Sequence, residues 1–125
     1  MTQPSELVLY IFNKLFNSNP DAQELLTQLQ GYEGYEPARV QLAILKLSNG
    51  DSEKLQDYIQ AARLDYRDVL AWAEYPEQIR SGKTRYNTDL DVYEAILKAD
   101  RQQYEAWLEE HRGQAAQDGS ETEKA

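Results

Sequence analysis

Two stretches of this chain resemble each other: LDYRDVLAW at Leu64–Trp72 and ADRQQYEAW at Ala99–Trp107. Asp65 and Asp100 lie 35 residues apart, and the Ala-Trp pairs that follow them are separated by the same distance. A near-repeat of this length is typical of stacked helix–turn–helix units, because each unit needs a neighbour to bury its apolar face. The pattern therefore predicts a small all-helical protein.

Apolar side chains recur at helical spacing along most of the chain. Five segments match the i, i+3, i+4, i+7 pattern of one buried helix face, namely residues 22–29, 40–47, 55–62, 66–73 and 104–111. No segment alternates for the length of a strand. We expect an all-α fold, a single-domain bundle of about six or seven helices with helical-hairpin packing. Its predicted core is Val8, Ile11, Leu15, Leu26, Leu29, Val40, Ile44, Leu47, Leu55, Ile59, Leu70, Trp72, Leu97 and Trp107.

The residues between these stripes predict where helices start and stop. Pro20 and Pro37 suit the first position of a helix, and Asn49-Gly50-Asp51 suits a left-handed helix end followed by an N-cap. Asp65 and Asp100 each resemble the first residue of a capping box. The apolar stripe nevertheless runs through Asp65 without losing phase, so residues 51–75 could form one helix or two.

Residues Val40–Trp72 resemble a tetratricopeptide repeat. The similarity lies at Leu42-Ala43 in the first helix, Gly50-Asp51 in the turn, Tyr58–Asp65 in the second helix and Ala71-Trp72 at the start of the next unit. Arg39 and Lys46 stand where that motif has aromatic side chains. The resemblance implies helical hairpins, and it implies the family's common role of binding peptides or helices in a concave groove.

Residues Asp65–Pro76 also look like a segment of small bacterial helical proteins of unassigned function. That resemblance implies a shared fold and no activity. The mixture of acidic, arginine and aromatic residues could form a binding face. It could equally form a structural lock, in which Arg63 or Arg67 pairs with Asp65 and Asp68.

Composition limits the class of protein. The chain has 125 residues and a net charge of −9, which suits one domain and opposes binding to nucleic acids or anionic membranes. It lacks cysteine, a long apolar run and a basic N-terminal signal, and these features favour a cytoplasmic location. We expect a helical domain over 1–112 and a disordered polar tail over 113–125.

Two segments are poorly explained by folding alone. The tandem Gly-Tyr-Glu segment, residues 31–36, brings Tyr32 and Tyr35 either against the core or onto a contact surface. The predicted loop from Tyr75 to Asn87 is longer than most connections in compact domains. Its side chains include a local excess of positive charge and two aromatic rings: Tyr75, Arg80, Lys83, Arg85 and Tyr86.

No pattern in the chain requires catalysis. His111 is the only histidine, and its place in the last apolar stripe favours a half-buried structural role over metal binding. We therefore expect no catalytic residues, no metal site and no cofactor.

These observations leave three functional hypotheses. The first is a protein–protein interaction module or small subunit of a complex, with Tyr32, Tyr35, Tyr75, Arg80, Lys83, Arg85 and Tyr86 as candidate contacts for an acidic partner. The alternative is a ligand-binding bundle or small enzyme with a pocket lined by Tyr32, Tyr35, Tyr66 and Arg67. The third is a homodimer joined through the first predicted helix, which is apolar on most sides.

Overall fold

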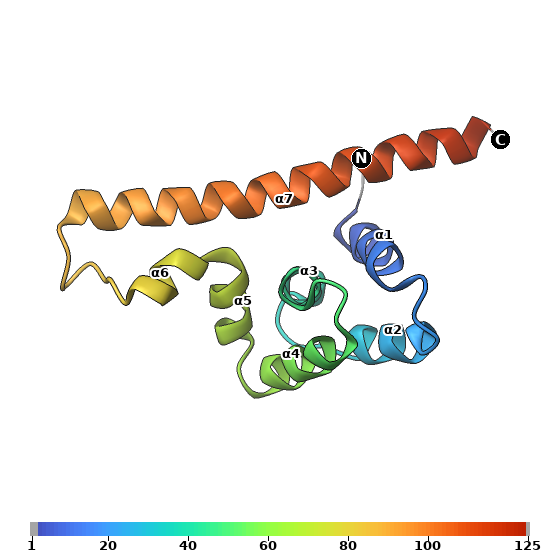
Figure 1. The fold of residues 1–125 in the computed structure, drawn as a ribbon, viewed down its shortest axis with the longest axis horizontal. Helices are drawn as coiled ribbons and strands as arrows, with labels where there is room; N and C mark the ends of the chain where they lie inside the picture. The colour runs from blue at the N-terminus through green and yellow to red at the C-terminus, as the bar shows by residue number, and fades with distance from the viewer. Residues whose placement is uncertain (1–2, 125) are drawn as a thin grey trace.

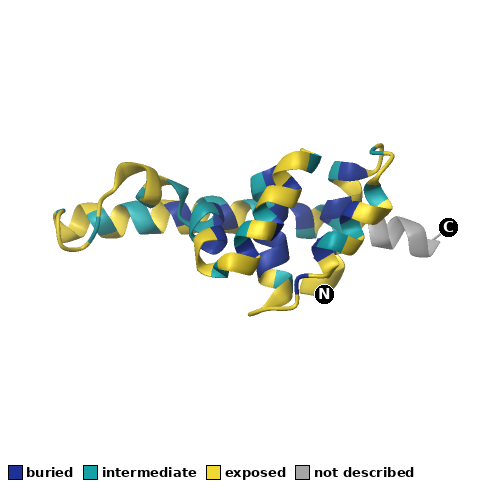
Figure 2. Cartoon of the chain, turned by 90° about the horizontal axis from the view of Figure 1, so that it is seen from below, coloured by how far each residue is buried: buried dark blue, intermediate teal, exposed yellow. Residues whose placement is uncertain are grey.

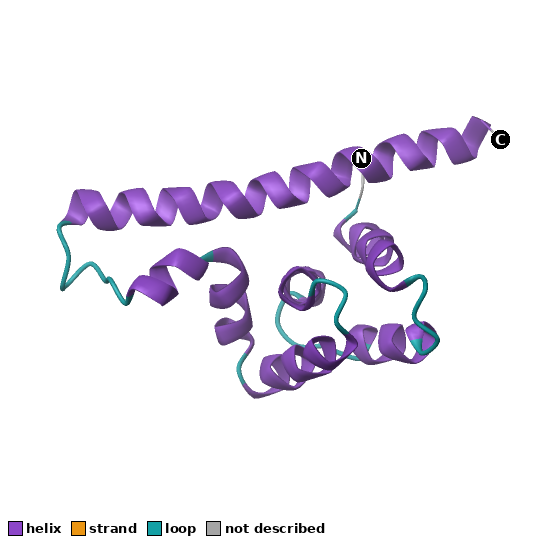
Figure 3. Ribbon diagram, viewed as in Figure 1, coloured by secondary structure: helices purple, strands orange, loops and turns teal. Residues whose placement is uncertain are grey.

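The computed structural model describes the backbone of residues 3–124 and the side chains of residues 3–117 (Figure 1). Within this part of the chain it contains seven helices and no strand, which confirms the predicted all-α fold (Figure 3). The helices are α1 (Pro4–Phe16), α2 (Ala22–Gln30), α3 (Pro37–Ser48), α4 (Ser52–Leu64), α5 (Tyr66–Glu74), α6 (Pro76–Ser81) and α7 (Leu90–Lys124).

Helix α3 lies at the centre of the bundle and packs against α1, α4 and α5 (Figure 1). Helix α2 packs on α4. The long helix α7 lies across one side of the molecule, where it contacts α1, α5 and α6. The C-terminal part of the chain therefore packs on the N-terminal part through α5, which contacts α3 and α4, and through α7, which contacts α1.

The core is formed mainly where α1, α3, α4 and α5 face one another (Figure 2). Eight of the predicted core residues are buried: Val8, Ile11, Leu29, Val40, Ile44, Leu55, Ile59 and Leu70. Six others are half-buried: Leu15, Leu26, Leu47, Trp72, Leu97 and Trp107. Helix α3 is buried on more than the one face that the sequence predicted, since the six residues from Val40 to Leu45 are all buried. Three neighbouring helices cover α3, so more than one face of it is removed from water.

Helix α1 contributes its apolar side chains to this core. Leu7, Val8, Ile11, Phe12 and Phe16 are all buried, and the rings of Phe12 and Phe16 stack with centroids 4.9 Å apart. Most of the apolar side chains that suggested a homodimer seam are thus buried within one chain, whereas Leu9 is 39% exposed, and the homodimer stays a prediction.

The junctions around α4 follow from local sequence. Asn49 and Gly50 have φ of 47° and 88°, and the Asp51 side chain accepts a hydrogen bond from the Lys54 backbone N–H at 3.1 Å. At Asp65 the backbone is extended, and the Asp65 carboxylate accepts from the Arg67 backbone N–H at 3.0 Å. The structure therefore has two helices over residues 51–75. The Arg67 guanidinium pairs with Asp65 at 2.9 Å, which is one of the pairs named by the lock hypothesis, while neither Arg63 nor Asp68 forms an ion pair among the described residues.

Asp100 does not begin a helix, so the predicted second capping box is wrong. It lies inside α7 with 2% of its surface exposed. Its two carboxylate oxygens accept from the backbone N–H groups of Glu77 and Gln78, each at 3.0 Å. These amides belong to the first turn of α6 and have no partner within that helix. Asp100 thus caps α6 from a distant part of the chain.

Two further boundaries differ from the sequence prediction. The expected loop Tyr75–Asn87 contains α6 in its first half, because Pro76 starts a new helix directly after α5. The expected disordered tail from residue 113 differs as well, since α7 continues through Gly113 to Lys124. Lys14 of α1 donates a hydrogen bond to Gln114, which ties this part of α7 to the bundle. The side chains of residues 118–125 lie outside the described part.

His111 closes the last apolar stripe, as predicted. It is 8% exposed, its ring meets Trp107 edge-on at 4.9 Å, and within the described structure its Nδ1 atom has no hydrogen-bond partner. Burial lowers the pKa of His111 below its ordinary value of 6.5, and Lys14 adds to this shift while Glu110 opposes it.

We expect this histidine to make the fold less stable below neutral pH. The unfolded chain takes up a proton at a higher pH than the folded protein, so the free energy of unfolding should decrease as the pH falls through 6.5. Denaturant unfolding at about pH 7.5 and about pH 5.5 measures this decrease. His111→Gln should lose much of it, and the same decrease in both proteins would contradict the assignment.

Candidate functional site

The candidate contact residues predicted from the sequence do not form one surface. Tyr32 and Tyr35 lie near the α4–α5 junction, and Tyr75 lines a pocket beside α7. Arg80, Lys83, Arg85 and Tyr86 lie at the end of the molecule where the chain passes from α6 to α7 (Figure 1).

Tyr32 belongs to the core, so its assignment as a partner contact is wrong. Only 4% of it is exposed, and its hydroxyl donates to the Tyr35 carbonyl oxygen at 3.4 Å. Gln41 donates to the Tyr32 carbonyl oxygen at 3.2 Å. A Cβ atom on Gly34 would lie 2.6 Å from the Tyr32 hydroxyl oxygen, so glycine permits this close packing. The first half of the Gly-Tyr-Glu segment therefore has a structural role.

Tyr35 is half exposed and stacks on Tyr66 with ring centroids 4.7 Å apart. Both rings, together with Tyr32 and Arg67, line a cavity of about 560 Å³ between the Gly-Tyr-Glu segment and the α4–α5 junction. These are the four residues of the predicted alternative pocket. Arg67 is held by Asp65 at the α5 N-cap, so its guanidinium already has an acidic partner.

A second candidate site is the end surface, which we define as Ile79, Lys83, Arg85, Tyr86, Leu90 and Val92. Its four apolar members are exposed by 43–90%, with Tyr86 the most exposed. The Arg85 guanidinium carbon lies 5.9 Å from the centre of the Tyr86 ring, within reach of a cation–π contact. In the described structure, neither Lys83 nor Arg85 forms an ion pair with an acidic side chain.

Several acidic and basic groups near the end surface act within the fold instead. Arg80 forms an ion pair with Glu77 one turn earlier, so this predicted contact is already engaged. The Asp89 side chain accepts from the Asp91 backbone N–H at 2.9 Å and thereby caps the start of α7. The positive charge left for a partner comes from Lys83 and Arg85.

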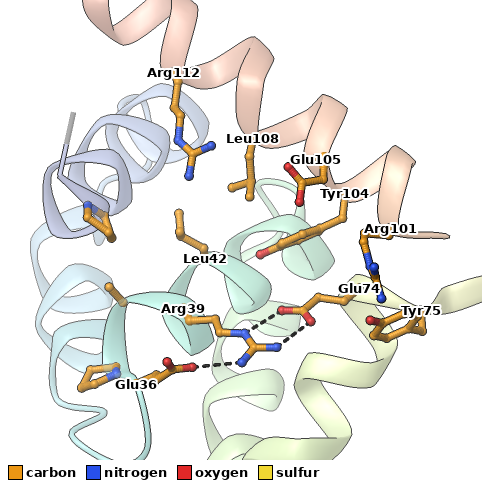
Figure 4. A pocket seen from close by; sticks show the side chains of 13 residues that line it. Glu36, Arg39, Leu42, Glu74, Tyr75, Arg101, Tyr104, Glu105, Leu108 and Arg112 are labelled. Carbon is orange, nitrogen blue, oxygen red and sulfur yellow. Dashed lines mark hydrogen bonds and ion pairs between the residues drawn. The ribbon is translucent and has the colours of Figure 1, made fainter. Parts of the chain in front are cut away.

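The third candidate site is a pocket between α3, α5 and α7, which we call the inter-helix pocket (Figure 4). Its cavity volume is about 570 Å³. Apolar atoms of Leu42, Leu108 and Tyr75 face it together with Pro4, Pro37 and Ala38. Its charged lining consists of Glu36, Arg39, Glu74, Arg101, Glu105 and Arg112.

An arginine between two carboxylates forms one wall of the inter-helix pocket (Figure 4). Arg39 donates to the two carboxylate oxygens of Glu74 at 3.0 and 2.8 Å, and to Glu36 at 2.9 Å. The Glu74 side chain is only 13% exposed. Hydrogen bonds to Glu74 and then Glu36 raise the pKa of Arg39 above its ordinary value. This network ties the start of α3 to the end of α5.

Tyr104 of α7 reaches into the inter-helix pocket opposite this network (Figure 4). It is 8% exposed, and its ring stacks on Trp107 at a centroid distance of 5.8 Å. The hydroxyl is buried and has no hydrogen-bond partner among the described residues. Burial raises the pKa of Tyr104 above its ordinary value, so the phenol keeps its proton at neutral pH.

Sequence reasoning missed the inter-helix pocket apart from Tyr75. Its residues come from four helices, and Arg39 and Glu74 are 35 positions apart in the chain. The spacing of neighbouring residues in the sequence therefore could not predict that they pair. The one available signal was Tyr104, a tyrosine with a polar end placed on an apolar stripe.

The described residues provide neither a metal-binding cluster nor a helix that could cross a membrane. Among the described residues, no group of three or more histidine, aspartate or glutamate side chains could hold a metal ion. None of the described helices combines the length and the apolar character that crossing a bilayer requires.

No protein-family model, curated protein or solved structure matches this chain. The tetratricopeptide resemblance of Val40–Trp72 therefore stays a prediction from the sequence.

Proposed function

We propose that this protein is an interaction module whose end surface docks an acidic segment of a partner protein. The observation that carries the proposal is the gathering of exposed apolar side chains and unpaired cations in one short part of the chain. Seven large hydrophobic side chains are exposed in the described part, and four of them fall within residues 79–92. Apolar side chains grouped in this way are characteristic of interaction surfaces.

Tyr86 is the expected anchor of the docked segment. Its ring is 90% exposed and so gains nothing from the protein's own core. Buried tyrosine rings contribute strongly to interface energies, because they cover a large area with little conformational freedom to lose. Ile79 and Leu90, exposed by 45% and 52%, provide further apolar area within the same part of the chain.

Charge favours an acidic partner segment. Lys83 and Arg85 are exposed and unpaired in the described structure, whereas the chain as a whole carries a net charge of −9. The net charge repels an acidic segment in general, whereas Lys83 and Arg85 attract it toward the end surface, on the side of Tyr86 away from Asp89 and Asp91 in the sequence. A nucleic acid or an anionic membrane presents many negative charges at once, and the net charge of the chain opposes both.

The test uses a synthetic peptide in which aspartate and phenylalanine alternate, measured by fluorescence anisotropy. We expect the double variant Lys83→Glu with Arg85→Glu to bind this peptide about tenfold more weakly than the original protein. Raising the salt concentration should weaken binding to the original protein and change little for the variant, since exposed charges are screened by salt.

The matched control is Lys54→Glu with Lys98→Glu, which changes the net charge equally at exposed positions of α4 and α7. This control should bind the peptide nearly as well as the original protein. Tyr86→Ala should weaken binding without lowering the melting temperature. Equal losses in the two double variants would contradict the proposal, because they would show that net charge alone governs binding. The same peptide with lysine in place of aspartate should not bind.

A further inference from the structure

We propose that the inter-helix pocket is a second binding site, which takes a small, uncharged and largely apolar molecule carrying a carbonyl oxygen. This site is separate from the end surface and does not depend on the function proposed for that surface. Three features of the pocket lead to this ligand class: a buried hydroxyl without a partner, a balanced charge and an apolar wall.

The buried hydroxyl indicates what the ligand must offer. The Tyr104 side chain is more than nine-tenths buried, reaches into the pocket and leaves its O–H group without a hydrogen bond in the described structure (Figure 4). Buried polar groups are nearly always hydrogen-bonded, because leaving one unpaired is costly. A carbonyl oxygen at this position would accept the phenol proton and supply the missing partner.

The charge of the pocket indicates that the ligand is neutral. Three arginines and three glutamates line it, so their formal charges cancel. Arg39 already holds Glu36 and Glu74, and Arg112 pairs with Glu109 at 2.7 Å. Arg101 and Glu105 form no ion pair among the described residues, but they lie four positions apart on α7 and their opposite charges attract each other. A ligand with a net charge would lose its hydration in the pocket and meet no net counter-charge there.

The size and walls of the pocket suit a compact apolar body. A volume of about 570 Å³ lies within the range of small-molecule sites. Leu42 and Leu108 face each other across it from α3 and α7, and the Tyr75 ring closes one side (Figure 4). The Trp107 ring stacks on Tyr104 and holds the phenol in place, so the hydroxyl is positioned before the ligand arrives.

The test compares four probes that share a phenyl ring and a short alkyl chain. 4-Phenylbutan-2-one carries the carbonyl, butylbenzene has no acceptor, and 4-phenylbutanoate and 4-phenylbutylammonium carry opposite charges. Titrations followed by the NMR signals of the Leu42 and Leu108 methyl groups report binding at this pocket. We expect the ketone to bind most tightly, with both charged probes about tenfold weaker because of their hydration.

Two tyrosine variants separate the hydroxyl from the apolar wall. Tyr104→Phe should weaken ketone binding about fivefold, the loss expected for one hydrogen bond between neutral groups, and leave butylbenzene binding unchanged. The control Tyr93→Phe alters a half-buried tyrosine of the same helix outside the pocket, and it should change neither.

The stability of Tyr104→Phe gives an independent measurement. Because the hydroxyl has no partner in the unliganded protein, the variant should melt at the same or a higher temperature than the original protein. A clear loss of stability would overturn the proposal, since it would show that the hydroxyl is already satisfied. Equal ketone binding by the original protein and Tyr104→Phe, tighter binding of a charged probe, or no ketone binding would overturn it as well.

Discussion

Replacing Leu45 with alanine should lower the free energy of unfolding by about 3–5 kcal/mol, because the side chain is fully buried and a cavity would remain. Leu45 lies on α3, the helix that packs against α1, α4 and α5, so the lost contacts involve the centre of the bundle. Chemical denaturation monitored by tryptophan fluorescence or circular dichroism measures the change.

The control for this prediction is Leu47→Ala, two residues further along the same helix. Leu47 was predicted to be buried, but the structure leaves it half-buried at the edge of the core. Since part of its surface stays in water, its removal should cost about 1–2 kcal/mol. Equal losses for the two variants would show that the centre of α3 is less tightly packed than described.

Asp100→Ala should destabilise the protein by about 2–3 kcal/mol, an unusually large effect for removing one carboxylate that forms no ion pair with a described arginine or lysine. Both oxygens of Asp100 accept backbone hydrogen bonds from the first turn of α6, and the side chain is 2% exposed. Without them, the Glu77 and Gln78 amides lose their partners. Burial lowers the pKa of Lys46 while Asp100 opposes this shift, so the substitution should lower that pKa further.

Hydrogen exchange locates the effect of Asp100→Ala. Amide protection from hydrogen exchange should fall most in α6 and at its contact with α7. In α1 to α4 it should fall by no more than the decrease in the free energy of global unfolding explains. Glu94→Ala removes an exposed carboxylate from the same helix and should change the stability little. Unchanged exchange in α6 for Asp100→Ala would contradict the capping role.

The two copies of the near-repeat show what local sequence can and cannot predict. At Asp65 the local sequence offered a cap but left one helix or two open, and the structure shows that the carboxylate accepts from the amide two positions later where the backbone is extended. Asp100 stands in a similar context, yet α7 runs through it unbroken. Its partners are 22 and 23 residues earlier in the chain, so no window around Asp100 could reveal them.

The candidate sites also differ in how much of each could be predicted from local sequence. The lining of the cavity beside Tyr35 and Tyr66 was predictable in part, because aromatic residues and glycines lie together in a short segment and face the α4–α5 junction. The positive cluster of Arg80, Lys83 and Arg85 was also apparent from the sequence, but only the structure shows that Arg80 pairs with Glu77. Tyr32 was misassigned because sequence alone does not distinguish a tyrosine that packs inward from one that faces solvent.

The sequence by itself determined the all-α class, the helical segments of α1 to α5 and the left-handed turn at Asn49-Gly50, because helical periodicity and capping depend on residues a few positions apart. It left open whether residues 51–75 form one helix or two, and it did not predict α6. Only the tertiary structure decided that α3 is buried on several sides, that Asp100 caps α6, and that Tyr104 faces the Arg39–Glu74 pair across a pocket. Those features join residues far apart in the chain, and their energies depend on burial and on the partner that each polar group finds.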